Sequence, residues 1–71
     1  MPQYELDAPG AAGLHRGRDA TDAVARATGC DRAAVEVAPG ADDAGWQAVT
    51  VDGRPAGRVR DHAARMRFRR D

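Results

Sequence analysis

The chain has 71 residues and no net charge, because eleven arginines balance eleven acidic residues and lysine is absent. It is long enough for one domain, residues 1–71, with a thin core, since such a domain buries only about 60% of the surface its unfolded chain exposes. The single cysteine excludes an internal disulfide and a multi-cysteine zinc site. With no signal-peptide pattern and no apolar run near the ~20 residues of a membrane helix, we expect a cytoplasmic protein that does not contact membranes.

The zero net charge hides an asymmetry along the chain. Residues 1–53 carry nine acids and four arginines, whereas residues 54–71 carry seven arginines and two acids. These charges either form an acidic face and a basic face or neutralise each other where the two parts pack.

The first predicted element is a strand at residues 3–7. Polar and apolar residues alternate there, which directs Tyr4 and Leu6 inward. Residues 8–18 follow with one proline and three glycines, and this composition predicts a loop.

A helix is predicted at residues 20–28. Asp19 can cap its amino terminus, Asp22 and Arg26 form an i, i+4 pair, and Gly29 suits a left-handed carboxyl-terminal cap. Four apolar residues share one face of this helix: Ala20, Ala23, Val24 and Ala27.

Residues 33–38 predict a second strand, with Val35 and Val37 on one face and Pro39 and Gly40 at its end. The spacing of an alanine, a turn glycine and Val35 also resembles that of helix-turn-helix proteins. The helix that this alternative requires would be cut by Pro39 after about one and a half turns, so we favour the strand.

Residues 46–60 predict a β-hairpin around Asp52-Gly53, a favoured type I′ turn pair. A two-residue turn sets Val51 opposite Arg54 and Trp46 opposite Val59, and a four-residue turn shifts the pairing by two residues. Both registers predict Trp46, Ala48 and Val59 on one face of the hairpin. Both predict the following residues on the other face: Gln47, Val49, Val51, Arg58 and Arg60.

The C-terminal pattern permits two structures. Residues 65–69 alternate arginine with Met66 and Phe68, which favours a strand. Asp61 could instead cap a short helix from His62 to Arg70. The fold class predicted overall is α+β: a three- to four-stranded, mainly antiparallel sheet packed by one helix at about residues 20–28, with a short C-terminal helix as the alternative ending.

The sequence assembles no catalytic chemistry. Serine is absent, Cys30 has no neighbouring histidine, and the spacing of His15, Cys30 and His62 matches no metal-ligand pattern. The glycines between residues 10 and 17 lack the lysine of a phosphate-binding loop. We therefore expect no enzyme, no cofactor and no metal.

The thin core and the opposed charges favour a small module that binds a protein, either a partner or a second copy of the chain, as a regulator, inhibitor or accessory subunit. The alternative is a nucleic-acid-binding domain whose arginines contact phosphates from the hairpin and the C-terminal segment. Under either hypothesis the expected contact residues are the arginine stripe and two aromatic residues: Arg58, Arg60, Arg65, Arg67, Arg69, Trp46 and Phe68.

Overall fold

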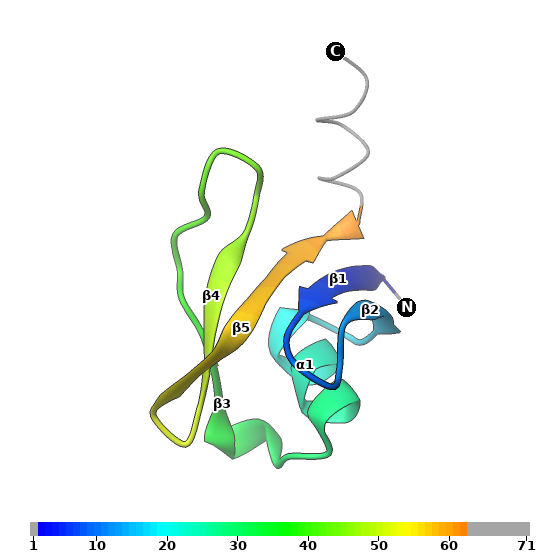
Figure 1. Cartoon of the computed structure of the whole chain (residues 1–71). Helices are drawn as coiled ribbons and strands as arrows, with labels where there is room; N and C mark the ends of the chain where they lie inside the picture. Colours follow the sequence, from blue (N-terminus) through cyan, green and yellow to red (C-terminus); the bar gives the residue numbers. More distant parts are fainter. Residues whose placement is uncertain (1, 63–71) are drawn as a thin grey trace.

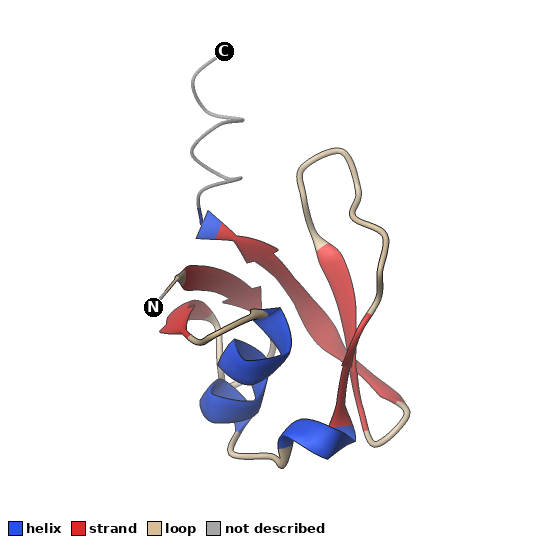
Figure 2. Cartoon of the chain, turned by 180° about the vertical axis from the view of Figure 1, so that it is seen from behind, coloured by secondary structure: helices blue, strands red, loops and turns tan. Residues whose placement is uncertain are grey.

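The computed structural model describes residues 2–62, which form one antiparallel sheet with a helix on one face (Figures 1 and 2). The strand order is β2-β1-β5-β4-β3, so the first and last strands pair at the centre of the sheet. The elements in chain order are β1 (Gln3–Asp7), β2 (Gly13–Arg16), α1 (Ala20–Thr28), a 3₁₀ turn (Arg32–Ala34), β3 (Val35–Val37), β4 (Gln47–Val51) and β5 (Arg54–Asp61). The predicted α+β class is confirmed. The C-terminal segment, predicted as strand or helix, lies outside the described residues.

The sheet has five strands where the sequence predicted three to four. The additional strand is β2, which lies in the segment predicted as a loop. β2 has no alternating apolar pattern, and its one large apolar residue, Leu14, is 46% exposed. This edge strand is defined by backbone pairing with β1, in the register Glu5 opposite Leu14, and a side-chain pattern does not reveal such pairing.

Helix α1 forms where it was predicted and begins with the predicted cap. The Asp19 Oδ1 atom accepts a hydrogen bond of 2.8 Å from the backbone N–H of Asp22. Gly29 ends the helix at φ +73°, and its N–H donates to the Ala25 carbonyl. The predicted Asp22–Arg26 ion pair is present at 3.3 Å.

The helix carries the chain from β2, at one edge of the sheet, to β3, at the other edge (Figure 2). Val35 and Val37 lie in β3 as predicted, which excludes the recognition helix of the helix-turn-helix alternative. Residues 33 and 34, predicted as strand, belong to the preceding 3₁₀ turn.

The core lies between α1 and the sheet. Leu6 of β1, Val24 of α1, Val35 of β3, Val49 of β4 and Val59 of β5 are all buried there. Valines make up most of this set, so the buried apolar volume is small, in agreement with the thin core expected from the composition.

The hairpin of β4 and β5 forms as predicted, but its faces differ from the prediction. Asp52 and Gly53 have φ angles of +53° and +77°, as a type I′ turn requires, and Val51 pairs with Arg54. The register then shifts: Thr50 pairs with Pro55, whereas Val49 pairs with Gly57. The extra residue in β5 is Ala56, which makes this irregularity a β-bulge.

The bulge overturns the predicted arrangement of the two hairpin faces. Gln47, rather than Trp46, approaches Val59 on the paired strand, and Ala48 pairs with Arg58. Val49 and Val59 therefore share the face toward α1, where both are buried. Ala48 lies with the two arginines on the opposite face. The two predicted registers differ from each other by two residues, so both direct each side chain to the same face. A one-residue bulge instead turns every residue beyond it to the opposite face of the sheet.

Candidate functional site

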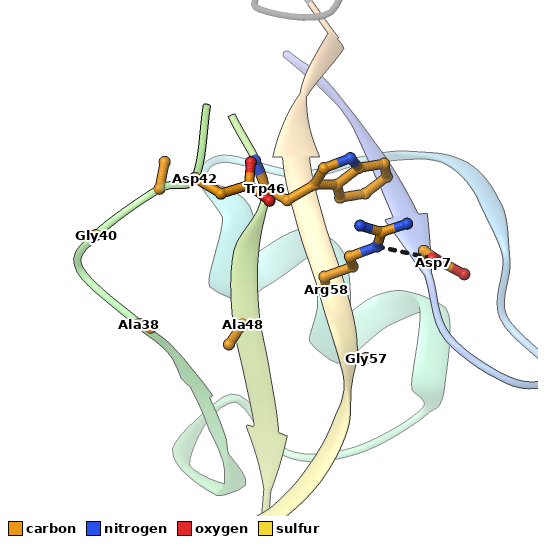
Figure 3. Close-up of a pocket in the computed structure, with 9 residues that line it drawn as sticks. Asp7, Ala38, Gly40, Asp42, Trp46, Ala48, Gly57 and Arg58 are labelled. Atoms are coloured by element: carbon orange, nitrogen blue, oxygen red, sulfur yellow. Dashed lines mark hydrogen bonds and ion pairs between the residues drawn. The ribbon is translucent and has the colours of Figure 1, made fainter. Parts of the chain in front are cut away.

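The face of the sheet turned away from α1 carries the residues that the sequence singled out. On β1, Glu5 and Asp7 point to this face, and Leu6 between them is buried in the core. On β5, Arg58 and Arg60 point to the same face, and Val59 between them is buried. Figure 3 shows part of this open face, with α1 behind the sheet. Its residues come from the central strands and from the loop between β3 and β4.

Trp46 is held over β5 by two arginines. The guanidinium carbons of Arg58 and Arg60 lie 4.4 Å and 4.3 Å from the centroid of its ring, within the range of cation–π interactions. Figure 3 shows the Arg58 guanidinium beside the indole. The ring is half-buried, so it still offers part of its surface to solvent.

Both arginines also form ion pairs across the β1–β5 junction. The Arg58 Nε atom donates to Asp7 Oδ2 at 2.8 Å, and the Arg60 Nε atom donates to Glu5 Oε1 at 2.9 Å. The two pairs differ in burial: the side chains of Arg60 and Glu5 are 15% and 24% exposed, whereas those of Arg58 and Asp7 are 50% and 56% exposed. The Arg60–Glu5 pair is thus the better shielded from water.

Asp42 shapes the loop that leads into Trp46. Its Oδ1 atom accepts hydrogen bonds of 2.9 Å from the backbone N–H groups of Ala44 and Trp46. The backbone closes the same turn, because the Asp42 N–H donates to the Trp46 carbonyl and the Gly45 N–H donates to the Asp42 carbonyl. This loop is further tied to β5, since Arg60 Nη1 donates to the Ala44 carbonyl at 3.2 Å.

A hollow of about 630 Å³ lies on the open face between this loop and β5, and we call it the open-face groove. Ala48 and Gly57 supply small residues, the Trp46 ring stands at one end, and Arg58 and Asp7 form a side, as Figure 3 shows. The lining residues are Asp7, Ala38, Gly40, Ala41, Asp42, Trp46, Ala48, Gly57 and Arg58. A smaller hollow of about 310 Å³ adjoins it through Ala38 and Ala48 and reaches Glu36 and Pro39.

The structure brings together three of the predicted contact residues, Trp46, Arg58 and Arg60. Arg65, Arg67, Phe68 and Arg69 lie outside the described residues. Sequence reasoning missed Glu5, Asp7, Asp42, Ala48 and Gly57 as parts of the site. Glu5 and Asp7 did carry a signal, because they alternate with Tyr4 and Leu6, which were predicted to point inward. Their spacing of two residues also matches that of Arg58 and Arg60.

The charge asymmetry of the sequence is partly neutralised on this face. Two of the arginines from the basic part of the chain pair with Glu5 and Asp7 from the acidic part. Of the two alternatives that the sequence left open, mutual neutralisation therefore describes the Arg58 and Arg60 side chains.

The potential ligand and nucleophile residues are dispersed. Cys30 is a half-buried free thiol that packs against the core, and His15 Nε2 lies 2.8 Å from the Ala11 carbonyl oxygen. Within residues 2–62, no group of three or more histidine, cysteine or acidic side chains could hold a metal ion. The same part of the chain contains no helix with the length and apolar character needed to cross a membrane.

Comparison with known proteins found no matching family model, no matching curated protein and no matching solved structure.

Proposed function

We propose that the chain is a non-catalytic protein-interaction module that acts in the cytoplasm and binds its partner at the open-face groove. The observation that carries this proposal is the face of the sheet that residues 2–62 leave open, where a half-buried tryptophan borders a hollow lined partly by alanine and glycine. Tryptophan and arginine are the residue types that contribute most to binding energy at protein interfaces. A regulator, an inhibitor or an accessory subunit would use such a surface.

Contacts within the chain orient Trp46 and the loop that leads into it. Trp46 is held by two guanidinium groups, and the loop before it is closed by Asp42. A preorganised surface loses less side-chain entropy on binding than a mobile one. This property supports a binding role for the groove, because the ordering cost is already met by folding.

The nucleic-acid alternative has less support from the described residues. Arg58 and Arg60 each donate to a carboxylate and lie on Trp46, so contact with phosphate would require them to exchange these partners. Binding to nucleic acid at low salt, with a steep decrease in affinity as salt rises, would favour this alternative over a protein partner.

The test is affinity capture from the native host with three forms of the chain: wild type, Ala48→Arg and Ala33→Arg. Ala48 lies exposed in the groove, and Ala33 is an exposed alanine in the 3₁₀ turn, so the second variant is a matched control. A partner should be retained by the wild type and Ala33→Arg. Its affinity for Ala48→Arg, measured with the purified partner, should fall at least about tenfold because the new side chain fills the groove.

Equal affinity of the partner for all three forms would show that the groove is not the binding surface. If no protein is captured and duplex DNA binds with strong salt dependence, the protein-interaction proposal is wrong.

A further inference from the structure

Strand β3 lies at one edge of the sheet and pairs with β4 on its inner side. Ala34 and Ala38, the residues that flank this strand, both form backbone hydrogen bonds to the β4–β5 hairpin. In an antiparallel pair the backbone groups of alternate residues point to opposite sides of the strand. The backbone groups of Val35 and Val37 therefore point outward, away from β4.

Three of these outward groups form no hydrogen bond within residues 2–62: the carbonyl of Val35 and both the N–H and the carbonyl of Val37. The Val35 N–H is occupied, because it donates to the Arg32 carbonyl. Pro39 has no N–H, so strand pairing along this edge ends there. Backbone groups in this arrangement are those that an added strand binds.

The side chains of β3 give this edge an alternating chemistry. Glu36 lies opposite Thr50 on the open face, where it is exposed and forms no hydrogen bond or ion pair within the described part of the chain. It borders the smaller hollow of about 310 Å³, together with the small residues Ala38 and Ala48. The valines on either side of Glu36 point to the opposite face of the sheet.

We propose that the partner of the open-face groove presents an extended segment that adds to β3 as an antiparallel strand, with a basic residue between two apolar residues. The first apolar residue exchanges two hydrogen bonds with Val37, and the second donates its N–H to the Val35 carbonyl. The basic side chain then lies beside Glu36 at the smaller hollow, while the apolar side chains lie beside the two valines. This inference rests on the proposed function of the groove and names the chemistry of the partner.

A second copy of the chain fits this edge less well. One two-fold register joins the Val37 N–H of each copy to the Val35 carbonyl of the other, and it sets the two Glu36 side chains directly opposite each other, where like charges repel. The register centred on Val37 lacks a donor for the Val35 carbonyl, because Pro39 would lie opposite it. Each of these registers forms two hydrogen bonds, fewer than the added strand forms.

Two synthetic peptides test the proposed motif: acetyl-Gly-Val-Arg-Val-Gly-amide and its counterpart with glutamate in place of arginine. Each is titrated into the isotope-labelled full chain, and the amide resonance of Val37 should shift because its N–H gains a partner. The wild type should bind the arginine peptide at least about fivefold more tightly than the glutamate peptide, since opposite charges on neighbouring strands attract and like charges repel. Glu36→Arg should invert this preference.

The matched control variant is Asp31→Arg, which changes the net charge by the same amount. Asp31 is exposed, makes no capping hydrogen bond and lines neither hollow, so this variant should keep the wild-type preference. The same preference in Glu36→Arg as in the wild type, or equal affinity of the wild type for the two peptides, would overturn the motif.

Methylated peptides test the backbone pairing. N-methylation of the second valine removes the N–H that donates to the Val35 carbonyl, and it should weaken binding at least about threefold. N-methylation of the arginine is the control, because its N–H points away from β3 in the antiparallel register, and affinity should stay within about twofold. Equal losses for the two methylated peptides would overturn the added strand.

The captured partner separates this inference from the proposed function. If Ala48→Arg weakens partner binding while Glu36→Arg keeps full affinity and neither peptide shifts the Val37 amide, the groove binds the partner and the added strand is wrong. If the peptides bind as expected while Ala48→Arg retains full affinity for the partner, the β3 edge binds extended peptides and the proposed function of the groove is wrong.

Discussion

Gly57 of β5 lies directly against the backbone of Asp7 in β1. A Cβ atom at position 57 would collide with the Asp7 carbonyl oxygen and would come within 2.8 Å of the Ala8 Cβ atom. The φ angle of Gly57 is +150°, a conformation that residues with a side chain rarely adopt. This glycine follows the bulge residue Ala56, so close approach of β1 and the change of register occur at the same point of β5.

Gly57→Ala should therefore destabilise the fold by about 2 kcal/mol or more, because strain at a positive φ adds to the collision with β1. Urea unfolding followed by circular dichroism measures the change. Gly53→Ala is the matched control: its φ is +77° but no atom lies within 4 Å of the added Cβ, so a loss of about 1 kcal/mol is expected. Equal losses for the two variants would contradict the close approach of β1.

The two ion pairs between β1 and β5 should differ in strength. Two double-mutant cycles measure the coupling energies. One cycle combines Glu5→Gln with Arg60→Gln, and the other combines Asp7→Asn with Arg58→Gln. We expect about 1 kcal/mol or more for the shielded Glu5–Arg60 pair and about 0.5 kcal/mol or less for the exposed Asp7–Arg58 pair. Arg58 and Arg60 both contact Trp46, so each cycle includes the loss of one such contact. A stronger coupling for the exposed pair would contradict the burial argument.

The contribution of Arg32 to stability should depend on pH. Hydrogen bonds from its guanidinium to Asp19, the cap of α1, are the largest cause that lowers the pKa of Asp19 below its ordinary value of 3.8. A carboxyl whose pKa is lowered by folding stabilises the fold above pH 3.8, and this stabilisation is lost as the pH falls through the lowered pKa. Arg32→Gln should therefore be less stable than the wild type at pH 7.

The difference between the two proteins should shrink as the pH falls below 3.8, which thermal unfolding between pH 7 and pH 2 can follow. Asp22 contributes to the same trend in both proteins, since the backbone N–H of Arg18 is the main cause of its lowered pKa. Arg54→Gln, at an exposed arginine beside the hairpin turn, is the control and should show a pH-independent difference from the wild type. A stability difference for Arg32→Gln that stays constant over this range would refute the linkage.

Val59→Ala should cost about 2 kcal/mol or more, since Val59 is completely buried between α1 and the sheet and its methyl groups would leave a cavity. Val51→Ala, at a half-buried position of β4, should cost less than about 1 kcal/mol. The free energies of unfolding in urea give both values. The same loss at both positions would be inconsistent with the deeper burial of Val59.

The sequence by itself determined the local elements of this protein. The cap at Asp19, the apolar face of α1, the glycine at position 29 and the type I′ turn at Asp52-Gly53 all formed as their local chemistry predicts. These features depend on residues within a few positions of each other, so their patterns are visible along the chain. The sequence also predicts Trp46, Arg58 and Arg60 as contact residues, and the structure places these three side chains together.

Only the tertiary structure decided which of these residues meet. The pairing of β1 with β5 joins residues more than fifty positions apart, and edge strand β2 pairs with β1 without an alternating apolar pattern. The bulge at Ala56 then places Arg58 and Arg60 on the same face as Trp46 and Ala48. Both arginines there contact the Trp46 ring, and Arg58 lines the groove. A single unpaired residue inverts the facing of a strand, and the need to bury Val49 and Val59 against α1 favours that inversion.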